Sequence, residues 1–191
     1  EREVAGYIQF LLNSSSGIEL TWQYFEKLGG QSESEMYITR EGTNCFESFR
    51  LRGFQYIDLS IDFNHAADIN RPMEIFFIGV NFVSFPVSYK GKFECSDENL
   101  NQIWKMGRYT DQLCMQNYHL DSPIHQEPLA DPGDYMIEAL ISYYSFGEYR
   151  LARQDILRIA YLLRNNNYFM FHTSYELLWI QMIMEYFQFT N

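Results

Sequence analysis

The sequence predicts an α+β chain in two parts, an antiparallel β-sandwich followed by α-helices. About seven short β-rich runs, separated by turn residues and spaced about ten residues apart, fill the first half, a pattern typical of sandwiches. Near Gly91 the pattern changes to helical periodicity, with capping and terminating residues. Because strands and helices are segregated along the chain, two domains or an α+β arrangement are indicated. We expect residues 1–92 to form the sandwich part and residues 93–191 the helical part.

The predicted strands are apolar or alternating runs that end at turn-forming residues. Asn13 to Gly17 form one turn cluster and Gly29-Gly30 another. The run at 54–61 alternates apolar and polar residues almost throughout, as a strand with one buried face does. The expected strands cover residues 4–12, 18–25, 36–39, 45–49, 54–61 and 74–85.

Four helices are predicted, each from its own boundary signals. The first has Ser96 as N-cap and acids in its first turn, and it runs to about Met115. The second has Asp131 as N-cap, Pro132 at its first position and Gly147 after its end. The third covers residues 148–164, and the fourth covers residues 175–187 after a capping-box pattern of Thr173 and Glu176. Buried stripes are expected at 136, 137, 140, 141 and 144 in the second helix and at 151, 152, 156, 159, 160 and 163 in the third. Helices this apolar leave faces uncovered, so we expect a larger helical assembly.

Composition excludes several classes of partner. With 14 basic residues and a net charge of −11, the chain lacks the clustered cations that bind nucleic acid or anionic lipid. Since it has no apolar run of about 18 residues, no membrane span is expected. A neutral ligand such as a sugar stays compatible, and the 18% aromatic content suits either a large core or a sugar-stacking cleft.

Cysteines and histidines do not form a recognisable ligand set. The three cysteines (Cys45, Cys95 and Cys114) show no CxxC spacing and adjoin apolar or aromatic residues, so we expect buried free thiols. The four histidines form no HxxxH or HExxH pair. We therefore expect no metal site and no cofactor.

The loop between the first two predicted helices carries most of the chemistry-bearing residues. Four carboxylates, two histidines and three prolines lie within residues 119–134. Loops of this length are usually functional or disordered, and the prolines favour order. Carboxylates held apart on a rigid backbone are what glycoside hydrolysis requires. Structural roles are also open, because Asp131 can cap a helix, Asp134 can complement its dipole and Asp121 can form a turn. Glu127 has the weakest structural role of the four.

The same loop resembles the acidic signature of α-L-rhamnosidases of glycoside hydrolase family 78, Asp-x-Pro-x-Arg-x-Glu-Arg-x-Gly-Trp-x-Gly-Asp. It matches that signature, with the same intervals, at Asp121, Pro123, Glu127, Gly133 and Asp134. The segment at 93–104 is similar to the family's passage from linker to first barrel helix. The segment at 50–57 is similar to the last part of its β-sandwich. The resemblance spans most of the chain, and its strand portion is the less specific part.

The resemblance implies a site and a reaction. Glu127 corresponds to the family's general acid, and Asp121 and Asp134 to the carboxylates that bind rhamnose hydroxyls. The family cleaves terminal α-L-rhamnosides with inversion on an (α/α)6 barrel, so residues 93–191 would be the N-terminal portion of that barrel and residues 1–92 the end of the sandwich. Its general base is a Glu from later in the barrel, and no residue here corresponds to it. This chain alone is therefore expected to be inactive.

Several signature positions depart from the family pattern. His125 stands in place of an Arg that contacts sugar hydroxyls and is itself a candidate substrate-binding residue, while Pro128 replaces a second Arg and Asp131 replaces a Trp. A related deoxy-sugar or a uronide is therefore an alternative to the rhamnose-containing glycoside. A non-catalytic carbohydrate-binding or scaffold protein that retains the fold is the alternative to an enzyme.

Other side chains near the loop have two interpretations. His119 could bind a sugar hydroxyl, and His172 is more simply a capping or packing residue. A stacking platform could be formed by Tyr118, Trp104, Tyr135 and Trp179, although Trp104 and Trp179 lie on apolar helical stripes typical of a core. The chain reads as a piece of a longer bacterial protein, so its oligomeric state and its compartment, periplasmic or cytoplasmic, stay open.

Overall fold

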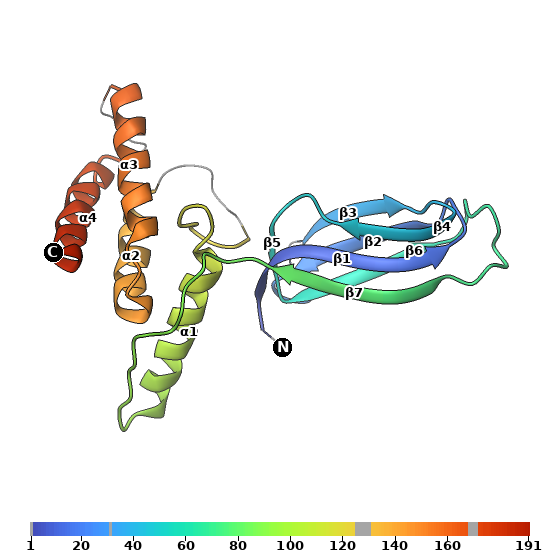
Figure 1. Ribbon diagram of the computed structural model, residues 1–191, viewed down its shortest axis with the longest axis horizontal. Helices are drawn as coiled ribbons and strands as arrows, with labels where there is room; N and C mark the ends of the chain where they lie inside the picture. Colours follow the sequence, from blue (N-terminus) through green and yellow to red (C-terminus); the bar gives the residue numbers. More distant parts are fainter. Residues whose placement is uncertain (1, 31, 125–130, 168–171) are drawn as a thin grey trace. The chain divides into compact units, whose positions relative to one another are not determined.

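The computed structural model describes residues 2–30, 32–124, 131–167 and 172–191. The chain divides into two compact units, residues 1–83 and 84–191, and each is considered by itself (Figure 1). The first contains antiparallel sheets and the second contains helices, as the sequence predicts. In the described ranges, no helix combines the length and apolarity that crossing a membrane requires.

The first unit is a sandwich of two antiparallel sheets. In one sheet β1 is central, with β4 and β5 along one edge and β7 along the other. In the second sheet β2 lies between β3 and β6. The strands are β1 (Val4–Ser14), β2 (Glu19–Phe25), β3 (Ser32–Ile38), β4 (Gly42–Glu47), β5 (Arg52–Phe54), β6 (Tyr56–Asp62) and β7 (Glu74–Phe82).

The sandwich core comes from alternate residues of the two central strands. Ile8, Phe10 and Leu12 of β1 are buried, and Leu20, Trp22 and Tyr24 of β2 face them. The rings of Phe10 and Trp22 meet edge to face, with centroids 5.9 Å apart. Alternation with a period of two places every second side chain on the inner face, so burial follows the pleat of β1 and β2.

One predicted strand is two strands in the structure. The run at 54–61 is interrupted at Gln55, where β5, paired with β1, gives way to β6, paired with β2. The backbone N–H of Gln55 donates to the carbonyl of Phe25 at 2.9 Å as the chain changes sheets. The side chains that face the core change parity at this point, from Phe54 in β5 to Leu59 and Ile61 in β6.

The second unit consists of α1 (Glu98–Cys114), α2 (Pro132–Phe146), α3 (Arg150–Asn165) and α4 (Tyr175–Thr190) among the described residues. α2 contacts each of the other three helices. Asp97, not Ser96, is the N-cap of α1, since its carboxylate accepts from the N–H of Asn99 at 2.9 Å. The predicted capping box of α4 does not form. Its N-cap is Ser174, and no side-chain hydrogen bond caps the helix.

The buried face of α2 differs from the predicted stripe. Tyr135, Ala139 and Tyr143 pack against Ile159 of α3 and Met182 of α4, whereas the predicted Ile137 and Tyr144 are exposed. The prediction was wrong for Ile137 and Tyr144, while the predicted Met136 and Leu140 are partly buried against this core. Because α2 is apolar on most of its circumference, periodicity does not single out one face. α4 is also apolar on most of its circumference, and Met182 is the only residue of this helix that is buried.

The cysteines also depart in part from expectation. All three are free thiols, but only Cys114 is buried, while Cys45 is exposed on β4 and Cys95 is half-buried before α1. Cys45 alternates along β4 with the buried Asn44, so it points to the outer face of the sheet. An apolar neighbour in sequence therefore does not predict burial in a strand.

Candidate functional site

The chain that leaves α1 folds back on the end of that helix before it reaches Asp121. Met115 and His119 form an antiparallel β-bridge, and the N–H of Leu120 donates to the carbonyl of Cys114 at 2.9 Å. Met115, His119 and Leu120 are all buried. Asp121 is thus the first half-buried residue after an anchored turn.

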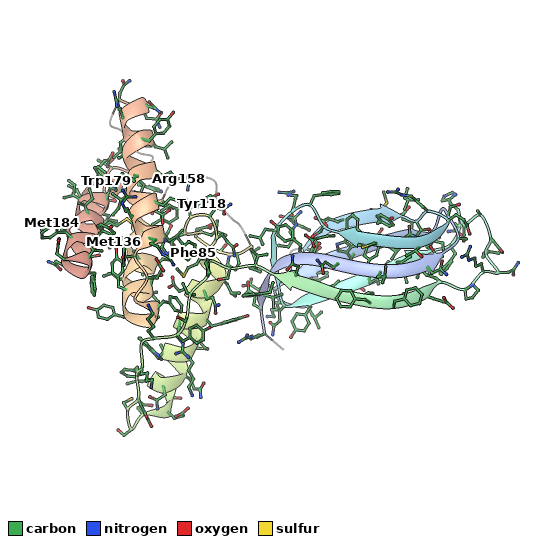
Figure 2. The ribbon with its side chains drawn as sticks, viewed as in Figure 1. Phe85, Tyr118, Met136, Arg158, Trp179 and Met184 are labelled. Atoms are coloured by element: carbon green, nitrogen blue, oxygen red, sulfur yellow. The ribbon has the colours of Figure 1, made fainter. Side chains whose placement is uncertain are left out.

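One face of α3 binds three consecutive residues of this turn. Gln154 donates through its Nε2 to the carbonyl of Asn117. The guanidinium of Arg158 lies 3.9 Å from the centroid of the Tyr118 ring, and both side chains are labelled in Figure 2. The carboxylate of Asp155 lies 2.6 Å from Nδ1 of His119. α3 therefore fixes the approach to Asp121.

Beyond His119 a chain of buried polar groups joins three helices. Nε2 of His119 lies 3.4 Å from Oγ of Ser142, and that hydroxyl donates to Oδ2 of Asp111 at 2.9 Å. All four side chains, counting Asp155, are buried. His119 is fully enclosed and its ring contacts other side chains, so the expectation that it binds a sugar hydroxyl is not supported by its position.

Carboxylates from several elements gather around the same place. Glu138 follows Asp134 by one helical turn on α2. Burial, together with the smaller effects of the carboxylates of Asp111, Asp155 and Asp134, raises the pKa of Glu138 to about 9. Burial also raises the pKa of Asp111 to about 6, against the opposing effects of His119 and the Ser142 hydrogen bond. This neighbourhood favours protonated carboxyl groups.

Cys114 connects this cluster with the loop. Burial raises the pKa of its thiol, and the carboxylates of Glu138, Asp111 and Asp121 add to that effect. Acids that are far apart in the sequence, on the loop, α1, α2 and α3, therefore lie near the end of α1. Such a set can hold a proton at neutral pH and can accept hydrogen bonds from hydroxyl groups.

The structure places part of the predicted site. Asp121 follows the anchored turn, and Asp134 lies in the first turn of α2, half-buried. Glu127 and His125, like Pro128, lie outside the described residues. Asp131 is at the N-cap position of α2 as predicted, but its side chain makes no capping hydrogen bond to that helix.

The four aromatic residues do not make a common platform. Tyr135 is fully buried, and the indole Nε1 of Trp179 donates to the carbonyl of Ile156 at 3.2 Å. Trp104 packs beside Phe93, with ring centroids 5.8 Å apart. Tyr118 is held by Arg158, and Trp179 packs against the helical core as predicted, whereas Trp104 does not belong to that core cluster.

Two buried or half-buried acids of this site, Asp155 and Glu138, were not predicted from the sequence. Asp155 occupies the buried stripe of α3 between Leu151 and Ile159, where a charged residue is unexpected. Glu138 repeats the position of Asp134 one turn later. A charged residue on an otherwise apolar stripe is the signal that could have located Asp155, and the one-turn spacing from Asp134 is the signal that could have located Glu138. Among the described residues, no group of three or more side chains is arranged to hold a metal ion.

The helical part of the chain is similar to a known glycosidase domain. Residues 88–173 match the family model described as the bacterial alpha-L-rhamnosidase 6 hairpin glycosidase domain. No curated protein matches the chain. The matched range includes the anchored turn, the acidic loop and α2.

Solved structures extend the similarity to the sandwich. A family 78 rhamnosidase of Bacillus sp. GL1 is 25% identical with a TM-score of 0.84, covering 97% of this chain and 20% of that one. A rhamnosidase from Klebsiella oxytoca with rhamnose bound is 18% identical with a TM-score of 0.78, covering 98% of this chain and 42% of that one. The α-L-rhamnosidase of Dictyoglomus thermophilum is 19% identical with a TM-score of 0.59, covering 83% of this chain and 19% of that one. This chain therefore spans less than half the length of each.

Proposed function

We propose, from its confirmed similarity to α-L-rhamnosidases of glycoside hydrolase family 78, that this chain supplies the acid side of a glycosidase active site. In this proposal Glu127 is the general acid that protonates the glycosidic oxygen. Asp121 and Asp134 accept hydrogen bonds from the sugar hydroxyls, and His125 adds a further contact. The substrate is a terminal α-L-rhamnoside, which is cleaved with inversion.

The main support for this proposal is the acidic signature in the loop before α2. Asp121, Glu127 and Asp134 occur at the family's intervals inside the matched domain. The described part of the loop leads into a group of carboxylates whose environment raises pKa values, as the behaviour of Glu138 illustrates. A general acid must stay protonated at working pH, and an acid-rich, half-buried setting favours that state.

The inverting reaction also requires a base, and no residue of this chain is assigned to that role. In inverting enzymes the two carboxyl groups lie about 6.5–9.5 Å apart so that a water fits between them. We assign the base to the rest of the helical barrel. Supporting this, α4 exposes a row of large apolar side chains that further helices would cover, namely Leu177, Ile180, Met184, Phe187 and Phe189. The 191 residues alone are then inactive.

The test is a Glu127→Gln variant of the complete protein, assayed on α-L-rhamnosides with good and poor leaving groups. We expect the variant to lose most activity on unactivated rhamnosides and to retain more on activated aryl rhamnosides, because a good leaving group needs little protonation. Glu94→Gln, at an exposed position before α1, is the matched control and should keep wild-type rates. Unchanged activity in Glu127→Gln would exclude Glu127 as the acid.

A second function is favoured by the departures at His125, Pro128 and Asp131. A protein that binds sugars without cleaving them would tolerate these changes, and so would a hydrolase for a related deoxy-sugar or uronide. A panel of aryl glycosides, with calorimetric titration of the free sugars, separates the three. Turnover of α-L-rhamnoside supports the first function, turnover of another glycoside changes the substrate, and binding without turnover supports the non-catalytic protein.

A further inference from the structure

We propose that Asp155 is a positioning residue that sets the place of Asp121 through a buried hydrogen-bonding contact with His119. The proposal rests on the function proposed above, since it is Asp121 that would meet the sugar. Asp155 itself is enclosed on α3 and reaches the site only through His119.

Asp155 holds both the side chain and the backbone of His119. Its Oδ2 lies 2.6 Å from Nδ1 and accepts from the backbone N–H of the same residue at 3.4 Å. Two contacts to one residue fix a position and an orientation, which a single contact does not. Both residues have no exposed surface, and they are 36 positions apart in the sequence. Asp121 follows His119 by two residues, so the short backbone between them allows Asp121 little freedom to move relative to His119.

The far side of the imidazole is also held. Nε2 lies 3.4 Å from Oγ of Ser142, whose own proton goes to Asp111. The imidazole therefore has a buried polar partner on each side, Asp155 at Nδ1 and Ser142 at Nε2. Glu138 of α2 is the remaining acid that faces this group. Removing one member leaves a buried polar group without its partner, which is costly.

The backbone between the anchor and Asp121 adds to the restraint. Leu120 is buried, and its N–H donates to the carbonyl of Cys114. Tyr118, on the other side of His119, lies against Arg158 one turn after Asp155. Of these contacts, the Asp155 pair is the only one that reaches both the main chain and the side chain of one loop residue. It is therefore the contact whose loss should move Asp121 most.

The activity test is a double-mutant cycle between Asp155 and Asp121 in the complete protein, with α-L-rhamnoside as substrate. We expect Asp155→Asn to raise KM about tenfold with a smaller change in kcat, since a displaced hydroxyl ligand weakens binding. Asp121→Asn should raise KM at least as much, and the double variant should be no worse than Asp121→Asn alone. Additive effects would overturn the proposal, because independent sites add. Arg153→Ala, on the exposed face of α3, is the control.

A second test does not depend on activity and so separates this proposal from the proposed function. Hydrogen exchange is measured on residues 117–121 and on α2 in the wild type, His119→Leu and His119→Asn. We expect His119→Leu to lose protection in residues 117–121 while α2 keeps it, and His119→Asn to restore it, because the Asn amide can donate to Asp155. Unchanged protection, or equal loss in α2, would overturn the positioning role. Absence of any glycoside turnover with this exchange pattern present would overturn the function alone.

Discussion

The ring of Tyr175, at the start of α4, lies directly against Gly133, at the start of α2. A β-carbon at residue 133 would come within 2.9 Å of both Cε1 and Cζ of that ring. Gly133 is one of the signature positions and immediately precedes Asp134. The absence of a side chain lets α4 pack against the first turn of α2, so this glycine helps to fix the turn that carries Asp134.

Gly133→Ala should therefore destabilise the helical unit, although alanine favours helices. Overpacking in a well-packed contact typically costs about 1–3 kcal/mol, which outweighs the gain of about 1 kcal/mol in helix propensity. Gly107→Ala on α1 is the matched control, because a β-carbon there meets no atom within 4 Å, and it should be neutral or stabilising. Urea unfolding of the two variants gives the comparison. Equal stabilities for both would show that α4 does not restrict residue 133.

Glu138 should make the stability of the helical unit depend on pH. Its pKa is raised to about 9 by burial and by neighbouring carboxylates, from a usual value of 4.5. The folded state thus keeps a proton that the unfolded chain releases, so this contribution is fully present below about pH 4.5 and is lost as pH rises toward 9. Glu138→Gln mimics the protonated form and should stabilise the unit at pH 7–8 by about 1–3 kcal/mol.

Unfolding free energies of wild type and Glu138→Gln, measured from pH 4.5 to pH 9, test this expectation. The difference should be small at the acidic end and should grow with pH. Glu185→Gln on α4 serves as the control, since it removes a carboxylate from a helix without entering the cluster. A constant difference across the range would contradict a shifted pKa at Glu138.

The sequence predicts those strands and helices whose burial and boundaries follow from local patterns. It does not predict features that depend on contacts between residues far apart in the sequence. The β1 and β2 core and the helix boundaries at Pro132 and Gly147 follow from the pleat and from cap chemistry. The division at Gln55 could not be predicted, because strand alternation does not say which sheet a segment joins. The same holds for Asp155, whose partner His119 is brought to it only by the fold.

The three thiols should differ in reactivity in the order of their exposure. Cys45 is exposed, Cys95 is half-buried with its Sγ 3.3 Å from the carbonyl of Asp97, and Cys114 is buried with its pKa raised by burial. Since the thiolate is the reactive form, Cys114 should react only after unfolding. Labelling with a thiol reagent at pH 8, followed by peptide mass spectrometry, gives the rates. Early labelling of Cys114 would mean that the end of α1 opens readily.

Asp134 should act in sugar binding and not chiefly as a helix-dipole partner. It lies in the first turn of α2, where a carboxylate stabilises a helix by about 0.3–1 kcal/mol through the helix dipole. Its charge also raises the pKa of Glu138, and this unfavourable interaction between carboxylates offsets the stabilisation. Asp134→Asn should therefore change stability little while lowering kcat/KM of the complete protein on α-L-rhamnoside by about tenfold or more, since a hydrogen bond to a charged acceptor is lost.

Glu98→Gln provides the comparison for that variant, because Glu98 occupies the first turn of α1 and complements its dipole without belonging to the acid cluster. Its kcat/KM should equal that of the wild type. Rates and unfolding curves for the two variants separate the two roles of an acid at a helix start. If Asp134→Asn keeps full activity and loses only stability, Asp134 is a dipole partner. The proposed sugar contacts of this chain would then rest on Asp121 and His125.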